Sequence, residues 1–202
     1  MKKIIIFFGV ILALGAKAQD NGYKSLFGNN FNVSGFGGPS MMLTNVSGEF
    51  AYMMGGGGAV LLNKTFFIGG YGYRLINRIE PNLNDVVFPQ QIGGQYLQEN
   101  SIDFDFGGIW TGIIIKGNKA IHPIVSCQFG WGNLSLNNDY ANIDDPVFVI
   151  NPIIEIEANI TRFFRMSIGG NYRIVQDVNF GEYKNSDFSG AGLFFGFKFG
   201  WF

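Results

Sequence analysis

Apolar and polar residues alternate one by one along much of this chain, and the pattern is clearest over residues 163–175. Here the even-numbered positions are mostly large and apolar, whereas the odd-numbered positions include Arg165 and Arg173. Successive side chains of a strand point to opposite faces, while a helix repeats about every 3.6 residues and would scatter the two arginines. The pattern therefore predicts a β-strand with one apolar and one polar face.

The same two-residue period predicts eight strands in all. It is strong in three further segments, 101–115, 150–160 and 193–201, and weaker in four others, 31–43, 49–63, 65–77 and 119–136. In 150–160, Glu155 and Glu157 lie opposite a row of isoleucines. In 101–115, one face carries Ile102, Phe104, Phe106, Trp110 and Ile114, and the other carries Asp103 and Asp105.

The connections between these segments alternate in length. Tight turns are expected at 63–64, 117–118 and 161–162, long loops at 78–98, 137–146 and 177–187, and a short first connection near 44–48. Short turns on one rim and long loops on the other are typical of bacterial outer-membrane barrels, and an open sheet edge would be costly in lipid. The sequence therefore predicts an all-β fold, an eight-stranded antiparallel transmembrane up-and-down β-barrel with short periplasmic turns and longer outer loops. Side chains fill the lumen of a barrel of this size.

Residues 1–18 have the layout of a secretory signal peptide. Two lysines precede an apolar run, and Ala16-Lys17-Ala18 fits the small-x-small rule for cleavage. The run is shorter than the roughly 20 residues that a spanning helix needs, so we expect no helical anchor in the mature chain. The expected organisation is cleavage near Ala18 and Gln19, a short periplasmic segment over 19–30 and an outer-membrane barrel over 31–202.

Composition fits this picture and excludes some functions. Glycine (30) and phenylalanine (22) are abundant among the 202 residues, as expected for close-packed strands with many exposed rings. Cys127 is the single cysteine and cannot form an internal disulfide. Cleavage after Ala18 removes three lysines and changes the formal net charge from −1 to −4, which argues against nucleic acid as a partner.

Charged residues separate between the two predicted rims. The long loops carry Glu80, Asp85, Asp139, Asp144, Asp145, Glu182 and Asp187. At or near the tight turns lie Lys64, Lys116, Lys119, Arg162 and Arg165. The outer rim is therefore expected to be acidic and the periplasmic rim basic.

The signal peptide, the eight alternating segments, the short and long connections and the terminal Phe202 together resemble the small OmpA/OmpX-type outer-membrane barrels. The glycine-rich blocks 35–39, 55–58 and 69–73 more specifically resemble an outer-membrane β-barrel family common in Bacteroidetes. Neither resemblance implies a defined reaction. The resemblance implies that Phe202 acts as a terminal assembly signal, although the apolar face from Leu193 to Trp201 has the opposite parity.

The polar faces suggest a charged network inside the lumen. We expect Glu155, Glu157, Arg165 and Arg173 to pair there, because a buried charge without a partner is costly. Asp103 and Asp105 are expected at the lumen or rim, next to a long loop. The residues expected to face lipid are Phe164, Tyr172, Phe195, Phe197, Phe199 and Trp201.

Other chemistry finds little support. His122 is the only histidine and is expected, with Ser126, to face the lumen rather than the outward rim that hydrolytic barrels use. Asp139, Asp144 and Asp145 lack the ordered spacing of a calcium loop, so a solvated acidic loop is expected. The glycine clusters lack the lysine and hydroxyl residue of a phosphate-binding loop. Cys127 shares its strand face with the residues expected to face lipid. No cofactor, metal or catalytic residue is therefore expected.

The function expected from these features is a non-enzymatic outer-membrane barrel with an envelope-structural or loop-mediated binding role. Its expected partners are outer-membrane lipid, the barrel-insertion machinery during assembly and an extracellular or envelope protein that contacts the outer loops. Two alternatives remain open. One is a small-solute or ion channel gated by the network of Glu155, Glu157, Arg165 and Arg173, and the other is a soluble periplasmic ligand binder of lipocalin type.

Overall fold

The computed structural model describes residues 31–80, 101–138, 141–179 and 183–202, with backbone alone for 136–138 and 141–143. Eight strands and one short helix make up this part of the chain. They are β1 (Val33–Val46), β2 (Glu49–Leu62), β3 (Phe66–Leu75), β4 (Ser101–Ile114), β5 (Ile121–Asn138), β6 (Ala141–Asn159), β7 (Phe164–Gln176), α2 (Asn185–Phe188) and β8 (Gly190–Trp201). The helix in the described part of the chain is too short to cross a bilayer.

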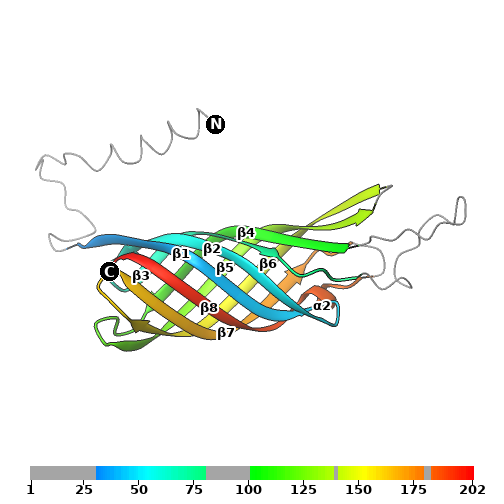
Figure 1. Cartoon of the computed structure of the whole chain (residues 1–202). Helices are drawn as coiled ribbons and strands as arrows, with labels where there is room; N and C mark the ends of the chain where they lie inside the picture. Colours follow the sequence, from blue (N-terminus) through cyan, green and yellow to red (C-terminus); the bar gives the residue numbers. More distant parts are fainter. Residues whose placement is uncertain (1–30, 81–100, 139–140, 180–182) are drawn as a thin grey trace, which may run out of the picture. The chain divides into compact units, whose positions relative to one another are not determined.

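The eight strands form one closed antiparallel barrel in sequence order (Figure 1). Each strand pairs with the next along the chain, and β8 returns to pair with β1 from Leu193 opposite Leu43 to Trp201 opposite Gly35. The predicted eight-stranded up-and-down barrel is therefore confirmed. The expected signal peptide and the segment 19–30 lie outside the described residues.

The two ends of the barrel differ in their connections. The β2–β3, β4–β5 and β6–β7 connections share one end with the start of β1 and the end of β8, and we call it the turn end (Figure 1, left). The opposite end, the loop end, carries the remaining four connections. Asn63 and Lys64 both have positive φ, at 50° and 55°, as the two-residue turn of a twisted hairpin requires.

One predicted loop is wrong. Residues 137–146 were expected to form a long loop, but β5 continues to Asn138 and β6 resumes at Ala141. The two strands stay paired to this point, with Ser135 opposite Asp144. They form a ribbon that extends past the other strands at the loop end (Figure 1). The predicted loop at 78–98 lies mostly outside the described residues.

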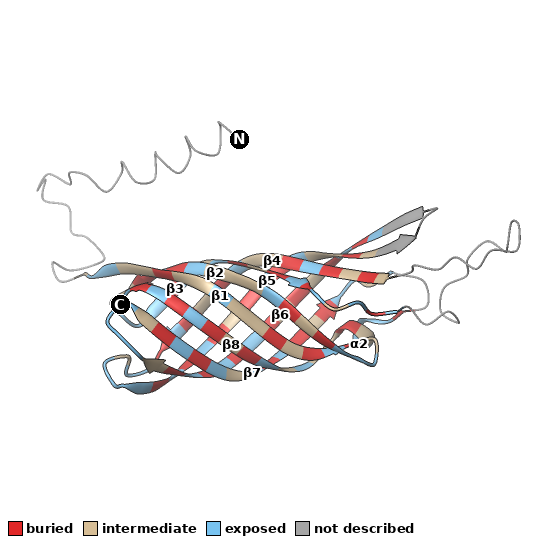
Figure 2. Cartoon of the chain, viewed as in Figure 1, coloured by how far each residue is buried: buried red, intermediate tan, exposed pale blue. Residues whose placement is uncertain are grey.

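Buried and exposed residues alternate along every strand, and the exposed ones are largely apolar on the outside of the barrel (Figure 2). Trp201 is 75% exposed, Trp131 69% and Ile154 66%, values that a barrel in water would rarely show for such large apolar side chains. The six aromatic residues expected on this surface all have outward parity. They are Phe164, Tyr172, Phe195, Phe197, Phe199 and Trp201.

Inward-facing glycines make room for aromatic rings inside the barrel. A Cβ atom on Gly57 would lie 3.3 Å from the Trp110 ring, and one on Gly55 would overlap the carbonyl oxygen of Gly72 and lie 2.7 Å from the Tyr73 ring. Outward-facing Gly70 differs, because the nearest atom to its added Cβ is 3.6 Å away. Part of the high glycine content therefore allows large side chains to fill a narrow lumen.

This packing predicts different effects on stability for two Gly→Ala substitutions. Gly55→Ala should lower the free energy of unfolding by about 1–3 kcal/mol, because the added methyl overpacks the lumen. Gly70→Ala should change it by less than about 0.5 kcal/mol. Urea unfolding of the detergent-folded protein, followed by tryptophan fluorescence, measures both values. Equal effects at the two positions would contradict the packing argument.

Candidate functional site

Five ionisable side chains meet in the lumen near the turn end, and we call them the charged cluster: His122, Glu155, Glu157, Arg165 and Lys198. Glu157 lies at the centre, with Oε1 3.1 Å from His122 Nε2 and accepting a 2.9 Å hydrogen bond from Arg165 Nη1. Lys198 Nζ lies 2.8 Å from Glu157 Oε2 and donates to Glu155 Oε1 at 3.0 Å. All five residues are buried. Two permanent cations therefore neutralise two carboxylates, which offsets the cost of burying them.

Strand register brings these side chains together. His122 on β5 lies opposite Glu157 on β6, and Arg165 on β7 lies opposite Lys198 on β8. Gly169 lies opposite Glu155, and a Cβ at that position would be only 2.8 Å from the Glu155 Cβ. Four consecutive strands thus contribute to the cluster, and a glycine leaves room for one of its carboxylates.

The cluster differs in membership from the network expected from the sequence. The structure places Glu155, Glu157 and Arg165 together, but it adds Lys198 and His122 and leaves Arg173 elsewhere. Lys198 lies on the face of the last strand opposite to the apolar face from Leu193 to Trp201, so the sequence pattern indicates that it points inward. Its height in the barrel was not, because height depends on how neighbouring strands are staggered.

Arg173 lies towards the loop end and is fully buried. Its Nε donates to the carbonyl oxygen of Phe188 at 2.8 Å, and its Nη2 donates to that of Asn45 at 2.9 Å. Nη1 lies 3.2 Å from Met53 Sδ, and the guanidinium carbon is 5.3 Å from the centre of the Phe104 ring. Arg173 therefore ties α2 to the end of β1 through two carbonyl groups, and the expectation that it pairs with the glutamates is wrong.

Apolar side chains close the lumen at the loop end. The helix α2 brings Phe188 inside the barrel, where its ring lies 5.5 Å from Tyr183 and 6.0 Å from Phe104. The other buried apolar residues near this end include Ile79, Ile102, Leu134, Val147, Val149 and Val175. The charged cluster is therefore separated from the loop end by an apolar layer.

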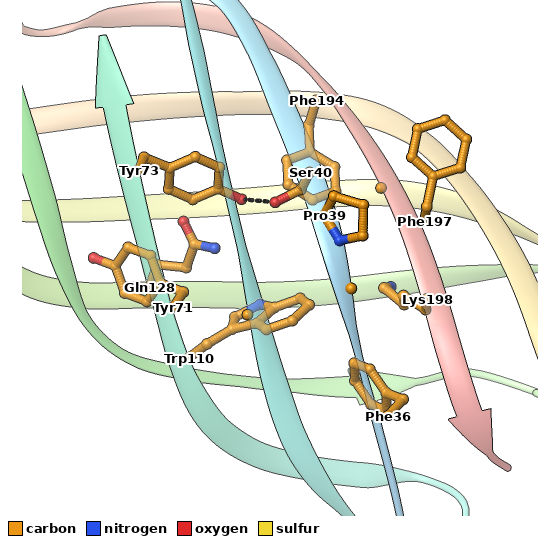
Figure 3. A pocket seen from close by; sticks show the side chains of 13 residues that line it. Phe36, Pro39, Ser40, Tyr71, Tyr73, Trp110, Gln128, Phe194, Phe197 and Lys198 are labelled. Carbon is orange, nitrogen blue, oxygen red and sulfur yellow. Dashed lines mark hydrogen bonds between the residues drawn. The ribbon is translucent and has the colours of Figure 1, made fainter.

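Aromatic rings occupy the side of the lumen formed mainly by β1 to β4 (Figure 3). Trp110 packs edge-on against Phe67 and Phe36, at 5.0 and 5.7 Å between ring centres. The further members of this group are Tyr71, Tyr73, Phe104 and Phe106. The cavity left between these rings and Lys198 measures about 10 Å³, enough for no more than about one water molecule.

Neutral polar groups fill the middle of the opposite side. Asn151 Nδ2 donates to Gln128 Oε1 at 2.9 Å, and Asn171 Nδ2 donates to Asn151 Oδ1 at 2.8 Å. Across the lumen, the hydroxyl groups of Ser40 and Tyr73 are 2.6 Å apart (Figure 3). Side chains therefore occupy the described lumen along its length, without a wide aqueous passage.

Asp103 and Asp105 were expected at the lumen or the rim, and the lumen position is wrong. Phe104 and Phe106 on the same strand are 0% and 2% exposed and point inward, so the two aspartates have outward parity. Asp105 is exposed and lies opposite Arg74 on β3. The apolar face of β4 fills the lumen at this height, and its polar face forms part of the outer surface near the loop end.

The remaining candidate groups have structural contacts. Asp144 Oδ1 accepts a 2.7 Å hydrogen bond from Ser135, and Asp145 Oδ2 accepts one of the same length from the Asn179 amide. Asp139 lies outside the described residues. His122 Nε2 contacts Glu157 rather than Ser126, although both His122 and Ser126 are buried in the lumen. Across the described ranges, no three His, Cys, Asp or Glu side chains are placed to hold a metal ion.

Comparison with known proteins supports the fold alone. The chain matches no protein-family model, and no curated sequence matches it. Among solved structures, it is similar to the Neisserial surface protein A (NspA), with a TM-score of 0.57 and 9% identity over 84% of this chain and 96% of that one. It is also similar to Ail, the attachment invasion locus protein of Yersinia pestis, with a TM-score of 0.50 and 11% identity over 84% and 97% of the two chains. The described part of the chain thus shares the small outer-membrane barrel fold of these proteins.

The charged cluster predicts a large stability effect at Lys198. Lys198→Met should lower the free energy of unfolding by about 3–5 kcal/mol, because it leaves two buried carboxylates with Arg165 as the only permanent cation. The double variant Glu155→Gln/Lys198→Met should lose less, because it removes one charge of each sign. Lys119→Met, at an exposed position, is the matched control. Urea unfolding checks the series, and a Lys198→Met protein as stable as the control would contradict the pairing.

Proposed function

We propose that this protein is a non-enzymatic outer-membrane β-barrel whose working surface is its loop end. The observation that carries the proposal is the distribution of side chains across the barrel wall. Large apolar residues such as Trp131, Ile154 and Ile168 are exposed outside, whereas Glu157, Lys198 and other charged residues are buried inside. A lipid-embedded barrel requires this distribution, and a lipocalin-type ligand binder in water requires the reverse.

The closed sheet and the aromatic rings exposed on the outer surface of the barrel further support a lipid environment. Pairing of β8 with β1 leaves no open sheet edge, which is the condition for strands to cross hydrocarbon. Trp201 packs against Phe163 near the turn end, and Trp131 packs against Phe148 further towards the loop end. Two such groups of rings fit the aromatic girdles that flank the apolar band of membrane barrels.

The filled lumen favours a surface role over transport. The charged cluster is internally neutral, aromatic rings fill the middle and α2 covers the loop end. Opening a pathway for ions or solutes would require breaking buried ion pairs and moving packed rings. We therefore favour the barrel as a scaffold over the channel alternative.

The β5–β6 ribbon is the proposed binding element. β5 has 18 residues and β6 has 19, whereas a strand needs only about 9–11 to cross a membrane. The excess carries polar groups, including Asn133, Ser135 and Asp144, which bond to one another. The similar structures belong to proteins described as a surface protein and an attachment invasion locus protein, and these descriptions support a role at the cell surface.

Orientation follows from the two kinds of connection. With the turn end in the periplasm and the loop end outside the cell, a signal peptide cleaved near Ala18 and Gln19 would deliver the chain for insertion into the outer membrane. Phe202 would then reach the barrel-insertion machinery from the periplasmic side. In the folded barrel its ring stacks on Phe36 at 5.7 Å, so recognition would precede this packing.

Thiol labelling tests the location and the orientation. In a Cys127→Ala background, Asp144→Cys on the ribbon should react with a membrane-impermeant maleimide in intact cells. Lys119→Cys at the turn end should react at least several-fold less until the outer membrane is permeabilised. Both residues are exposed, so local burial does not separate them. Equal labelling in intact cells, or recovery in the soluble periplasm, would contradict the proposal.

Recording of ionic current across a planar bilayer tests whether the lumen conducts ions. Heat-modifiable, folded protein should give no discrete single-channel openings, because the lumen is filled by side chains. Arg165→Ala is the informative comparison, since it removes one cation of the charged cluster. Reproducible openings in the unmodified protein that change in this variant would favour the channel alternative instead.

A further inference from the structure

A pocket of about 370 Å³ opens at the turn end of the barrel. Its volume falls in the range of about 300–1,000 Å³ that small-molecule sites occupy. The residues that line it come from the β2–β3 connection, the end of β4, the β4–β5 connection, β7 and the last residue of the chain. They are Lys64, Thr65, Ile114, Lys116, Gly117, Asn118, Arg165 and Phe202.

The pocket is strongly basic. Lys64, Lys116 and Arg165 contribute three cations, and the one anionic group among the lining residues is the α-carboxylate of Phe202. Among the described residues, neither lysine has an ion-pair partner. Arg165 donates one hydrogen bond to Glu157, which leaves its other N–H groups as donors for a ligand. Its guanidinium carbon lies 3.7 Å from the centre of the Phe202 ring. The pocket and the charged cluster together contain four permanent cations against the carboxylates of Glu155 and Glu157 and the α-carboxylate of Phe202, so an excess of one positive charge faces this opening.

Hydrogen bonds fix the positions of the two lysine-bearing turns. The Ile114 amide donates to the carbonyl oxygen of Thr65 at 2.7 Å, which joins the end of β4 to the β2–β3 connection. Asn159 Nδ2 donates to the carbonyl oxygens of Gly117 and Lys119, at 3.1 and 2.8 Å. The lysines therefore extend from fixed positions on the barrel rim.

Both lysines occupy backbone conformations that favour glycine or asparagine. Lys64 has φ of 55° and Lys116 has φ of 57°, in the left-handed region that non-glycine residues adopt at a cost. Glycine would fit both turns with less strain.

We propose that this pocket binds a phosphate group. Two ammonium groups and a planar guanidinium are suited to a phosphate, because the lysines provide point charges and the arginine provides paired donors. The volume exceeds that of the bare ion, so the group can be free phosphate or the phosphate of a glycerophospholipid headgroup in the periplasmic leaflet. Binding in detergent does not depend on the proposed location of the barrel, so the two proposals fail separately.

Phosphate titration of the isotope-labelled full chain, folded in a non-ionic detergent, tests the site. Amide signals of Lys64, Thr65, Lys116, Gly117 and Asn118 should shift and saturate with inorganic phosphate, beyond any shift in sodium chloride of equal ionic strength. Lys64→Gly/Lys116→Gly should weaken binding at least tenfold while leaving the barrel folded, because glycine suits both turns. Lys119→Ala, on the same β4–β5 connection but outside the pocket lining, should change the affinity less than twofold.

Four results would overturn the proposal: shifts that do not saturate, shifts that chloride reproduces, unchanged binding in the Lys64→Gly/Lys116→Gly variant, or equal loss of binding in the Lys119→Ala control. The source of the phosphate is resolved in lipid nanodiscs. If phosphatidylglycerol or phosphatidylcholine discs produce the same shifts without added phosphate, the lipid headgroup is the ligand. If neither kind of disc produces the shifts until inorganic phosphate is added, the ligand is soluble phosphate.

Discussion

Hydrogen bonding between β8 and β1 closes the sheet, and the other features of the molecule depend on this closure. A closed sheet has no edge, so the backbone groups of every strand can pair within the barrel. It also divides space into an inside and an outside, and each strand residue must face one or the other. With eight strands the inside is just wide enough for side chains to fill.

The lumen is filled by two different kinds of packing. On one side, inward glycines such as Gly57 allow Trp110, Tyr71 and their neighbours to pack ring against ring. On the other side, buried carboxylates are tolerated because Lys198 and Arg165 pair with them and the cluster is neutral. Charge pairing and ring packing thus achieve the same result, a barrel without a wide passage.

A filled lumen leaves the two ends as the surfaces on which partners can act. The loop end has a polar ribbon and an apolar layer held by Arg173, whereas the turn end has exposed lysines around a pocket. These ends differ in charge as well as in shape. Among the described residues, four of the seven acidic residues expected at the outer rim lie at the loop end, and the basic residues expected at the other rim lie at the turn end.

The two-residue period of the sequence by itself determined the number of strands and the grouping of residues by face, because side-chain parity is a local property of an extended backbone. Parity does not say which face points inward. On β4 the ring-bearing face fills the lumen and Asp103 and Asp105 lie outside, because apolar side chains are favourable both in a packed lumen and on a lipid-facing wall.

The sequence also placed Glu157 and Arg165 on neighbouring inward faces, since only a tight turn separates their strands. The choice of Lys198 rather than Arg173 as the further cation was decided only by the tertiary structure, because the stagger of strands around a closed barrel sets the height of each side chain in the lumen.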